Sequence, residues 1–270
     1  MKKFINVKNK MVWDNYSIVR KNDKMLYVHL YLEGISNNLG YCMFNLEDII
    51  TTCGMKVDNH KGKSVDVFKI LLCDLIDSNN ITGITKEEIL NVKPKELIKL
   101  NFDNKLNLEE NKYFKVPTDK INELFANHTD VNSINIYCYI VARCINKLYC
   151  FPSMEEIEND LNISNRTIYK YLDELETLGI LYYDTVGKNK TTNRYLNNVY
   201  ALSKEGLKEG LDKSYEYYDG VSIDKISKSE RKNQTSKAVR KIKVKDKSYV
   251  RFQEEGFMNN NDNKICYENY

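Results

Sequence analysis

The amino-acid sequence predicts an α-rich α+β fold for the 270 residues. The main observation is a pair of helix-start signals in the middle of the chain. Ser153 and Glu156 have the spacing of a capping box, and Ser164 is a favourable N-cap residue for a second helix. Apolar residues recur every three or four positions after each signal, which is typical of helices with one buried face. Two stretches that follow the second helix in the sequence, residues 180–183 and 198–202, have the residue pattern of strands.

The first of these helices begins at Met154, and Gly179 is a favourable C-cap residue for the second. Asn162 interrupts the apolar pattern between the two. The inward-facing residues are Met154, Ile157 and Leu161 in the first helix and Ile168, Leu172 and Leu175 in the second. Two short helices joined by a tight turn form a helix-turn-helix.

A predicted β-hairpin follows the two helices. Residues 180–183 form a strand, residues 187–194 a basic loop and residues 198–202 a returning strand, and we interpret this hairpin as a wing. With FPS at 151–153, ISNRTI at 163–168 and the end of the second helix, the segment resembles the winged helix-turn-helix family. This family is common in phage and plasmid replication proteins and in some transcription regulators.

The second helix and the wing carry the candidate DNA-contacting residues: Ser164, Asn165, Arg166, Thr167, Tyr169, Lys170, Lys188, Lys190 and Arg194. Arg166 is placed to donate two hydrogen bonds to a guanine edge, and Asn165 to read adenine or bind phosphate. Thr167 and the free amides at the helix start suit a phosphate, Lys170 suits the DNA backbone, and Tyr169 suits a sugar or a thymine methyl group. The alternative is a solvated helix face that makes only protein contacts.

The first hundred residues carry a weaker copy of this design. Tyr41-Cys42 aligns with Tyr149-Cys150 at an offset of 108 residues, and Asn45 stands where Ser153 caps the first helix. The aligned apolar positions of the second helices are Phe68, Leu72 and Leu75 against Ile168, Leu172 and Leu175. The sequence therefore predicts two tandem winged helix-turn-helix domains.

The alignment extends upstream of both helix pairs. Residues 4–7 align with residues 113–116, and each stretch is followed by a predicted amphipathic helix, at 24–36 and at 134–146. We therefore expect each copy to begin with a short strand and a helix of its own.

The first copy differs from the second in the segment that follows its second helix. Thr85 and Glu88 form another capping box, and we expect residues 97–102 to pair with residues 112–116. The second helix of this copy has few cations and carries three acidic residues, Asp66, Asp74 and Asp77. The first copy is therefore either a dimerisation or partner-binding domain or a weaker DNA reader.

Positive charge is concentrated near the end of the chain. Residues 1–202 contain 26 Lys and Arg and 26 Asp and Glu, whereas residues 225–251 contain 11 basic and two acidic residues. Such a basic segment is typical of contact with a polyanion, and the alternative is a solubilising tail. The candidate residues for nonspecific nucleic-acid contact are Arg240, Lys241, Lys243, Lys245 and Lys247.

A short helix is predicted ahead of this basic arm. Leu207, Leu211 and Tyr215 fall on one side of it, and Gly206 and Gly210 are expected to weaken it because glycine disfavours helix interiors. We expect the arm itself to be flexible.

Several function classes have no support in the sequence. No apolar run approaches the roughly 20 residues of a membrane helix, and no signal-peptide pattern occurs. The seven cysteines form no C-x-x-C pair, which predicts reduced thiols in a cytoplasmic protein. His29, His60 and His128 lack metal-ligand spacing, and the common nucleotide-binding and hydrolase motifs are missing. We therefore expect no enzyme activity, metal, cofactor, membrane contact or small-molecule ligand.

These observations predict an N-terminal winged-helix-like domain at 1–110, a DNA-binding winged helix-turn-helix domain at 111–203, and a short helix with a basic arm at 204–270. The resemblance implies sequence-specific binding of double-stranded DNA by a replication initiator or replisome organiser of a mobile element. The alternatives are a transcription regulator with the same domains and a scaffold that docks replication or partition proteins. The expected partners are double-stranded DNA and either a second copy of the chain or replication proteins.

Overall fold

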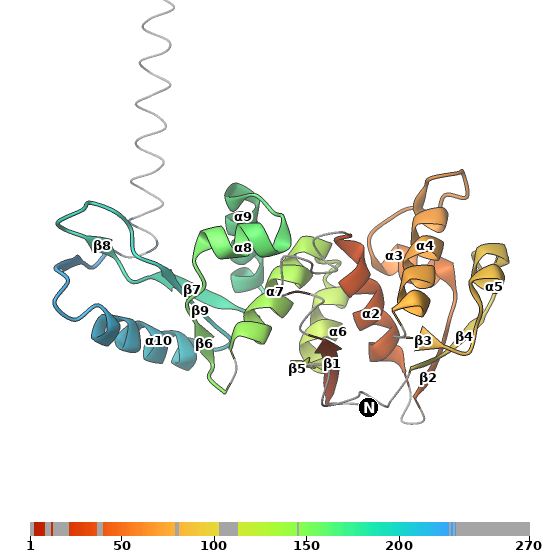
Figure 1. The fold of residues 1–270 in the computed structure, drawn as a ribbon, viewed down its shortest axis with the longest axis horizontal. Helices are drawn as coiled ribbons and strands as arrows, with labels where there is room; N and C mark the ends of the chain where they lie inside the picture. The colour runs from red at the N-terminus through yellow and green to blue at the C-terminus, as the bar shows by residue number, and fades with distance from the viewer. Residues whose placement is uncertain are drawn as a thin grey trace, which may run out of the picture.

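Two structural halves lie side by side along the long axis of the molecule, and a last helix lies at one end (Figure 1). The computed structural model describes residues 3–8, 12, 22–36, 40–78, 81–102, 113–144, 146–226, 228 and 230. The five candidate residues of the basic arm, from Arg240 to Lys247, lie outside the described residues.

The first half has one three-stranded sheet and four helices among its described residues. Its elements are β1 (Phe4–Lys8), α2 (Lys24–Ile35), β2 (Tyr41–Phe44), α3 (Leu46–Thr52), α4 (Ser64–Asp77), β3 (Ile81–Thr82), α5 (Lys86–Asn91) and β4 (Ile98–Phe102). β4 is the central strand in the sheet order β2-β4-β3 and is antiparallel to both neighbours. The predicted caps are confirmed: Asn45 accepts a hydrogen bond from the Asp48 amide, and Thr85 and Glu88 form a capping box.

The second half has a similar order of elements, with an additional helix after its first strand and a short strand in the place of α5. Its elements are β5 (Tyr113–Pro117), α6 (Thr118–Ala126), α7 (Val131–Arg143), β6 (Tyr149–Cys150), α8 (Met154–Leu161), α9 (Asn165–Thr177), β7 (Tyr182–Thr185), β8 (Lys188–Asn189) and β9 (Asn198–Ala201). The sheet order is β6-β9-β7, so β9 takes the central place that β4 has in the first half. Each half therefore places two helices between its first and second sheet strands.

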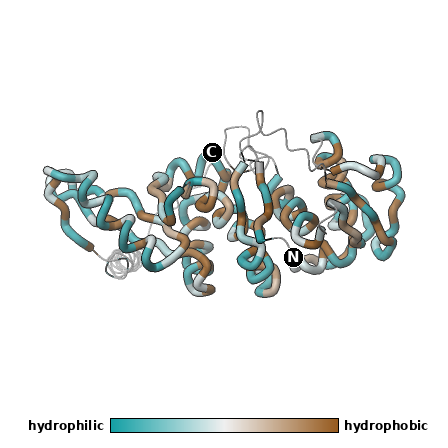
Figure 2. Tube along the Cα trace, turned by 90° about the horizontal axis from the view of Figure 1, so that it is seen from below, coloured by the Kyte–Doolittle hydropathy of each residue, from teal (hydrophilic) through white to brown (hydrophobic). Residues whose placement is uncertain are grey.

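A two-stranded ribbon and a pair of central helices join the halves. β1 is antiparallel to β5, and α2 contacts α7. One cluster of buried apolar side chains continues through both halves, and Figure 2 shows hydrophobic stretches in each of them. The molecule therefore has one shared core across the junction.

Two expectations from the sequence are wrong here. The sequence predicts that residues 97–102 pair with residues 112–116, but β4 pairs with β2 and β3, and β5 pairs with β1. The helices α2 and α7, expected to have one solvated face, are buried on nearly all sides over most of their length. Nearly every residue from Met25 to Leu32, and from Ser133 to Ala142, is buried, because these helices lie between the other elements of both halves.

The last described elements cover the outer face of the second sheet. They are α10 (Lys204–Tyr217) and the short strand β10 (Ile223–Asp224), which pairs with β8. Leu207, Leu211 and Tyr215 share one side of α10, as the sequence predicts, and this side packs on a small apolar cluster around Tyr149 and Val199. No helix among the described residues is long and apolar enough to cross a membrane.

Gly206 and Gly210 have a different role from the one expected. Both are buried, and both face the sheet from α10. A Cβ atom added at Gly206 would lie 2.8 Å from the backbone oxygen of Leu148, and one added at Gly210 would lie 2.6 Å from Cγ1 of Val199. The two glycines therefore allow close contact between helix and sheet, which their low helix propensity does not reveal.

Candidate nucleic-acid interface

The helix pair α8 and α9 begins and turns where the sequence predicts. The Ser153 hydroxyl accepts a hydrogen bond from the Glu156 amide at 3.1 Å, and the Glu156 carboxylate accepts one from the Ser153 amide at 2.6 Å. Asn162 ends α8 in the left-handed conformation with φ 55°, which short polar side chains tolerate best after glycine. Gly179, with φ 68°, follows the last turn of α9. These local signals fix a tight helix-turn-helix.

The start of α9 is less open than the sequence indicates. The Asn165 backbone amide, the first of the helix, donates to the carboxylate of Glu158 on α8. The Ser164 hydroxyl makes no cap bond to the backbone and instead lies 2.8 Å from the Thr167 hydroxyl. A DNA phosphate at this helix start would therefore meet the Glu158 carboxylate. The expectation of free amides is wrong for the first of them.

Arg166 and Lys170 occupy the outward side of α9. They are one helical turn apart and therefore lie on the same face, and both side chains are exposed. Arg166 makes no ion pair with any described carboxylate, and the Lys170 ammonium lies 4.7 Å from the centre of the Tyr171 ring. Both cations are thus available to a partner that approaches α9 from solvent.

Tyr169 lies toward the wing. Its hydroxyl accepts a hydrogen bond from the side-chain amide of Asn198 on β9 at 3.3 Å, and its ring lies 6.2 Å from that of Tyr183 on β7. The side chain is half-buried. Tyr169 thus fixes the position of α9 relative to the wing, and its predicted contact with a sugar or a thymine methyl group stays a prediction.

The wing combines the antiparallel strands β7 and β9 with a loop that follows β8. Lys190 and Arg194 are exposed at its tip, whereas Lys188 is half-buried, with its ammonium 5.5 Å from the centre of the Tyr195 ring. Asn189 shapes the tip, because its side-chain oxygen accepts hydrogen bonds from the amides of Thr191 and Thr192 at 2.8 and 3.0 Å. The wing therefore exposes two of its three predicted cations to solvent.

The strand β10 supports this tip, and the sequence does not predict it. β10 pairs with β8 through Ile223↔Asn189 and Asp224↔Lys188. Gly187 permits the pairing: its φ is 131°, and an added Cβ would lie 2.5 Å from the backbone oxygen of Asp224. The sequence signal is the glycine that begins the basic loop, and glycine is also common in unpaired turns.

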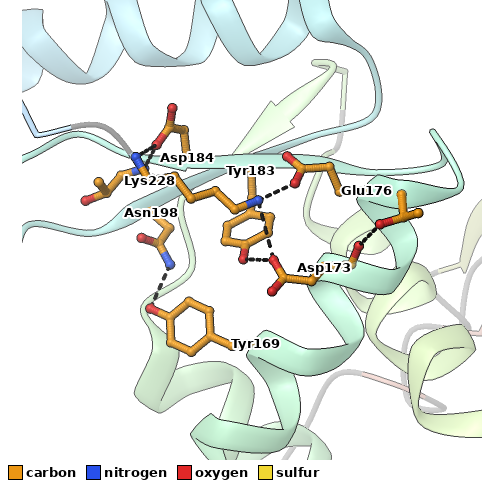
Figure 3. Close-up of polar contacts among 9 residues, drawn as sticks. Tyr169, Asp173, Glu176, Tyr183, Asp184, Asn198 and Lys228 are labelled. Atoms are coloured by element: carbon orange, nitrogen blue, oxygen red, sulfur yellow. Dashed lines mark hydrogen bonds and ion pairs between the residues drawn. The ribbon is translucent and has the colours of Figure 1, made fainter. Parts of the chain in front are cut away.

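A second missed feature is the position of Lys228, which the sequence shows only as one cation of the basic segment. Figure 3 shows its ammonium among side chains of α9 and β7. It pairs with the Glu176 carboxylate, lies 3.6 Å from Oδ1 of Asp173, and lies 3.4 Å from the centre of the Tyr183 ring. The Lys228 side chain is 17% exposed. The two carboxylates belong to the carboxyl-terminal half of the predicted recognition helix.

Two further hydrogen bonds complete this cluster. The Lys228 backbone amide donates to Oδ1 of Asp184 at 3.1 Å, and the Tyr183 hydroxyl donates to Oδ1 of Asp173 at 2.6 Å. Burial raises the pKa of Tyr183 above its ordinary value, and the hydrogen bond to Asp173 raises it further. Tyr183 therefore stays protonated and continues to donate at neutral pH.

The equivalent helix of the first half, α4, has a different surface. Lys69 donates to the backbone oxygen of Leu90 on α5 at 2.7 Å, and Asp77 pairs with Lys86 at the start of α5. Asp66 accepts a hydrogen bond from the Gly62 amide. Ile70 remains 54% exposed on this helix. The outer side of α4 is thus partly covered by α5 and has little unpaired positive charge.

The described residues contain no cluster of three or more histidine, cysteine or acidic side chains that could hold a metal ion. The six cysteines in the described part of the chain form no disulfide with one another, and four of them are buried. The structure thus offers neither a disulfide nor a metal centre in this part of the chain.

The helices α8 and α9 with the tight turn between them form a helix-turn-helix. The family model of the helix-turn-helix domain matches residues 132–181, a range that contains α8 and α9 and ends just ahead of the wing. No curated protein matches the chain. A helix-turn-helix with a cationic outward face indicates DNA binding.

Proposed function

We propose that the chain binds double-stranded DNA sequence-specifically through α9 and the wing. The observation that carries this proposal is the exposed pair Arg166 and Lys170 on α9, on the same half of the molecule as the exposed wing cations Lys190 and Arg194. Arg166 is the residue that would read a base, because its guanidinium can donate two hydrogen bonds to a guanine edge. The other three cations would contact phosphates and fix the register of the helix.

The two halves act as tandem winged helix-turn-helix domains with different tasks in this proposal. Their sheets have the same strand order, which supports a common design. The three acidic residues of α4, Asp66, Asp74 and Asp77, would repel a DNA phosphate backbone, which favours a protein partner for the first half. That partner would be a second copy of the chain or a replication protein.

We assign the protein to the initiation of replication of a mobile element, as the resemblance of its helix-turn-helix segment implies. A selection of random duplexes by the full-length chain tests DNA binding, and footprinting of the enriched duplex then defines the site. We expect one enriched motif. Equal recovery of all sequences would contradict sequence-specific reading.

A second assay separates replication from transcription. A plasmid that lacks its own origin and carries the selected site should be maintained only in cells that produce the chain. Loss of this plasmid, together with regulation of a reporter promoter that carries the same site, would instead identify a transcription regulator. Failure in both assays would favour the scaffold.

A further inference from the structure

We propose that Lys228 is a positioning residue of the DNA interface, which neutralises Asp173 and Glu176 so that the full length of α9 can approach the phosphate backbone. This inference rests on the proposed DNA binding by α9. It concerns a residue outside the helix-turn-helix and the wing tip, on a segment that reaches α9 only after the chain has passed through α10 and β10.

The charge on α9 creates the need for such a residue. Asp173 lies seven residues, or two helical turns, after Arg166, and is half-buried on the side of the helix next to β7. Glu176 follows within the next turn. Without compensation, these two carboxylates would repel phosphates on the helix that is meant to enter the groove. The first half of α9 thus attracts DNA, and the second half would oppose it.

The contacts of Lys228 place a positive charge at this point. Its ammonium touches both carboxylates and the face of the Tyr183 ring, and its backbone amide is fixed by Asp184. A cation over an aromatic ring gains further electrostatic stabilisation. Tyr183 and Asp184 are consecutive on β7. The wing sheet therefore holds Lys228 in place while its ammonium compensates the negative charge on α9.

The location of Lys228 also corresponds to the boundary between the two proposed DNA contacts, those of α9 and of the wing. Lys228 lies between α9 and β7, as Figure 3 shows. If α9 lies in a groove and the wing contacts the same duplex, the phosphate strand that borders the groove must pass this boundary. Uncompensated carboxylates here would face the most negative part of the DNA. Lys228 removes that repulsion, and it does not need to contact the DNA itself.

DNA-binding measurements on charge-neutralised variants of the chain test this role. Lys228→Met keeps most of the apolar stem and removes the charge, and it should weaken binding to the selected duplex by about three- to tenfold. The pair Asp173→Asn and Glu176→Gln, added to Lys228→Met, should restore the affinity to within about twofold of wild type, because no carboxylate is then left uncompensated. The side-chain oxygen that Asp173→Asn retains can still accept the hydrogen bond of the Tyr183 hydroxyl.

Lys204→Met is the matched control. Lys204 also lies over a tyrosine of β7, with its ammonium 5.8 Å from the centre of the Tyr182 ring, but it pairs with no described carboxylate. This variant should bind DNA as the wild type does. Thermal unfolding of all variants shows whether they are folded at the temperature of the binding measurement.

Two results would overturn the inference. Lys228→Met with wild-type affinity would show that the carboxylates do not matter to DNA. Weak binding that the double neutralisation does not restore would indicate either a direct phosphate contact by Lys228 or a purely structural role. The separate failure of the proposed function would appear as a wild-type chain that binds no duplex at all.

Discussion

Asn6 of β1 and Lys115 of β5 lie directly opposite each other in the ribbon that joins the two halves of the chain. The same two residues are equivalent in the internal sequence repeat, in which residues 4–7 align with residues 113–116. When two equivalent strands pair antiparallel and a residue lies opposite its own equivalent, an approximate two-fold axis passes through that pair of residues and relates the two strands. The ribbon thus joins the repeats as a small dimer interface joins two subunits.

The shared ribbon predicts that the two halves unfold together. Val116 of β5 is fully buried beside β1, so Val116→Ala should lower the free energy of unfolding by about 1–3 kcal/mol. Hydrogen exchange at increasing denaturant would show equal shifts for peptides from α4 and α9. Met43→Ala, at a side chain that is 51% exposed on β2, is the control and should change stability little. A shift confined to one half would contradict a common core.

Gly206 supports a second stability prediction. Replacement by alanine in an exposed helix would stabilise it by up to about 1 kcal/mol. At this position the new Cβ would lie 2.8 Å from the backbone oxygen of Leu148, which cannot move aside easily, so Gly206→Ala should instead destabilise the protein by about 1–3 kcal/mol. Thermal unfolding measures the sign. An increase in Tm would show that α10 does not pack against the sheet as described.

Local signals made the helix ends predictable from the sequence. The caps at Asn45, Thr85 and Ser153 act within three residues of themselves, and all three helices begin where the sequence predicts. The pairing partners of the strands were harder to predict. The alternating pattern of residues 98–102 shows which side chains are buried, but it does not show which neighbour the strand has.

The candidate site was predictable to a similar extent. Arg166 and Lys170 are exposed on α9 as the helical spacing predicts, since both positions follow from the period of one helix. Lys228 could not be assigned, because its carboxylate partners lie about fifty residues earlier in the chain and no local pattern links them. The hydrogen bond from the Asn165 amide to Glu158 could not be predicted either, because many acidic residues near a helix start face solvent.

The wing tip should contribute affinity without sequence preference. Lys190 and Arg194 are exposed and would meet phosphates, so the double replacement by alanine should weaken binding to all duplexes alike. The slope of log affinity against log salt should become shallower by about one unit for each phosphate that the variant no longer neutralises. A change in the preferred sequence would show instead that the wing reads bases. An unchanged slope would remove the tip from the interface.

Deletion of residues 231–270 tests the predicted basic arm. This boundary keeps β10 and Lys228, so the described interface remains complete. The deletion should lower the affinity for specific and nonspecific duplexes by the same factor and flatten the salt dependence, because the arm contains most of the concentrated positive charge. If both the affinity and the slope stay unchanged, the arm is a solubilising tail.

The affinity of Arg166→Ala for the selected duplex and for a set of single base-pair substitutions tests the central claim most directly. Lys208→Ala, an exposed cation on α10, is the control, and circular dichroism verifies the fold of both variants. Arg166→Ala should lose about 1–3 kcal/mol of binding free energy and should no longer discriminate at one base pair. Wild-type affinity and wild-type discrimination in a folded Arg166→Ala protein would contradict groove reading by α9.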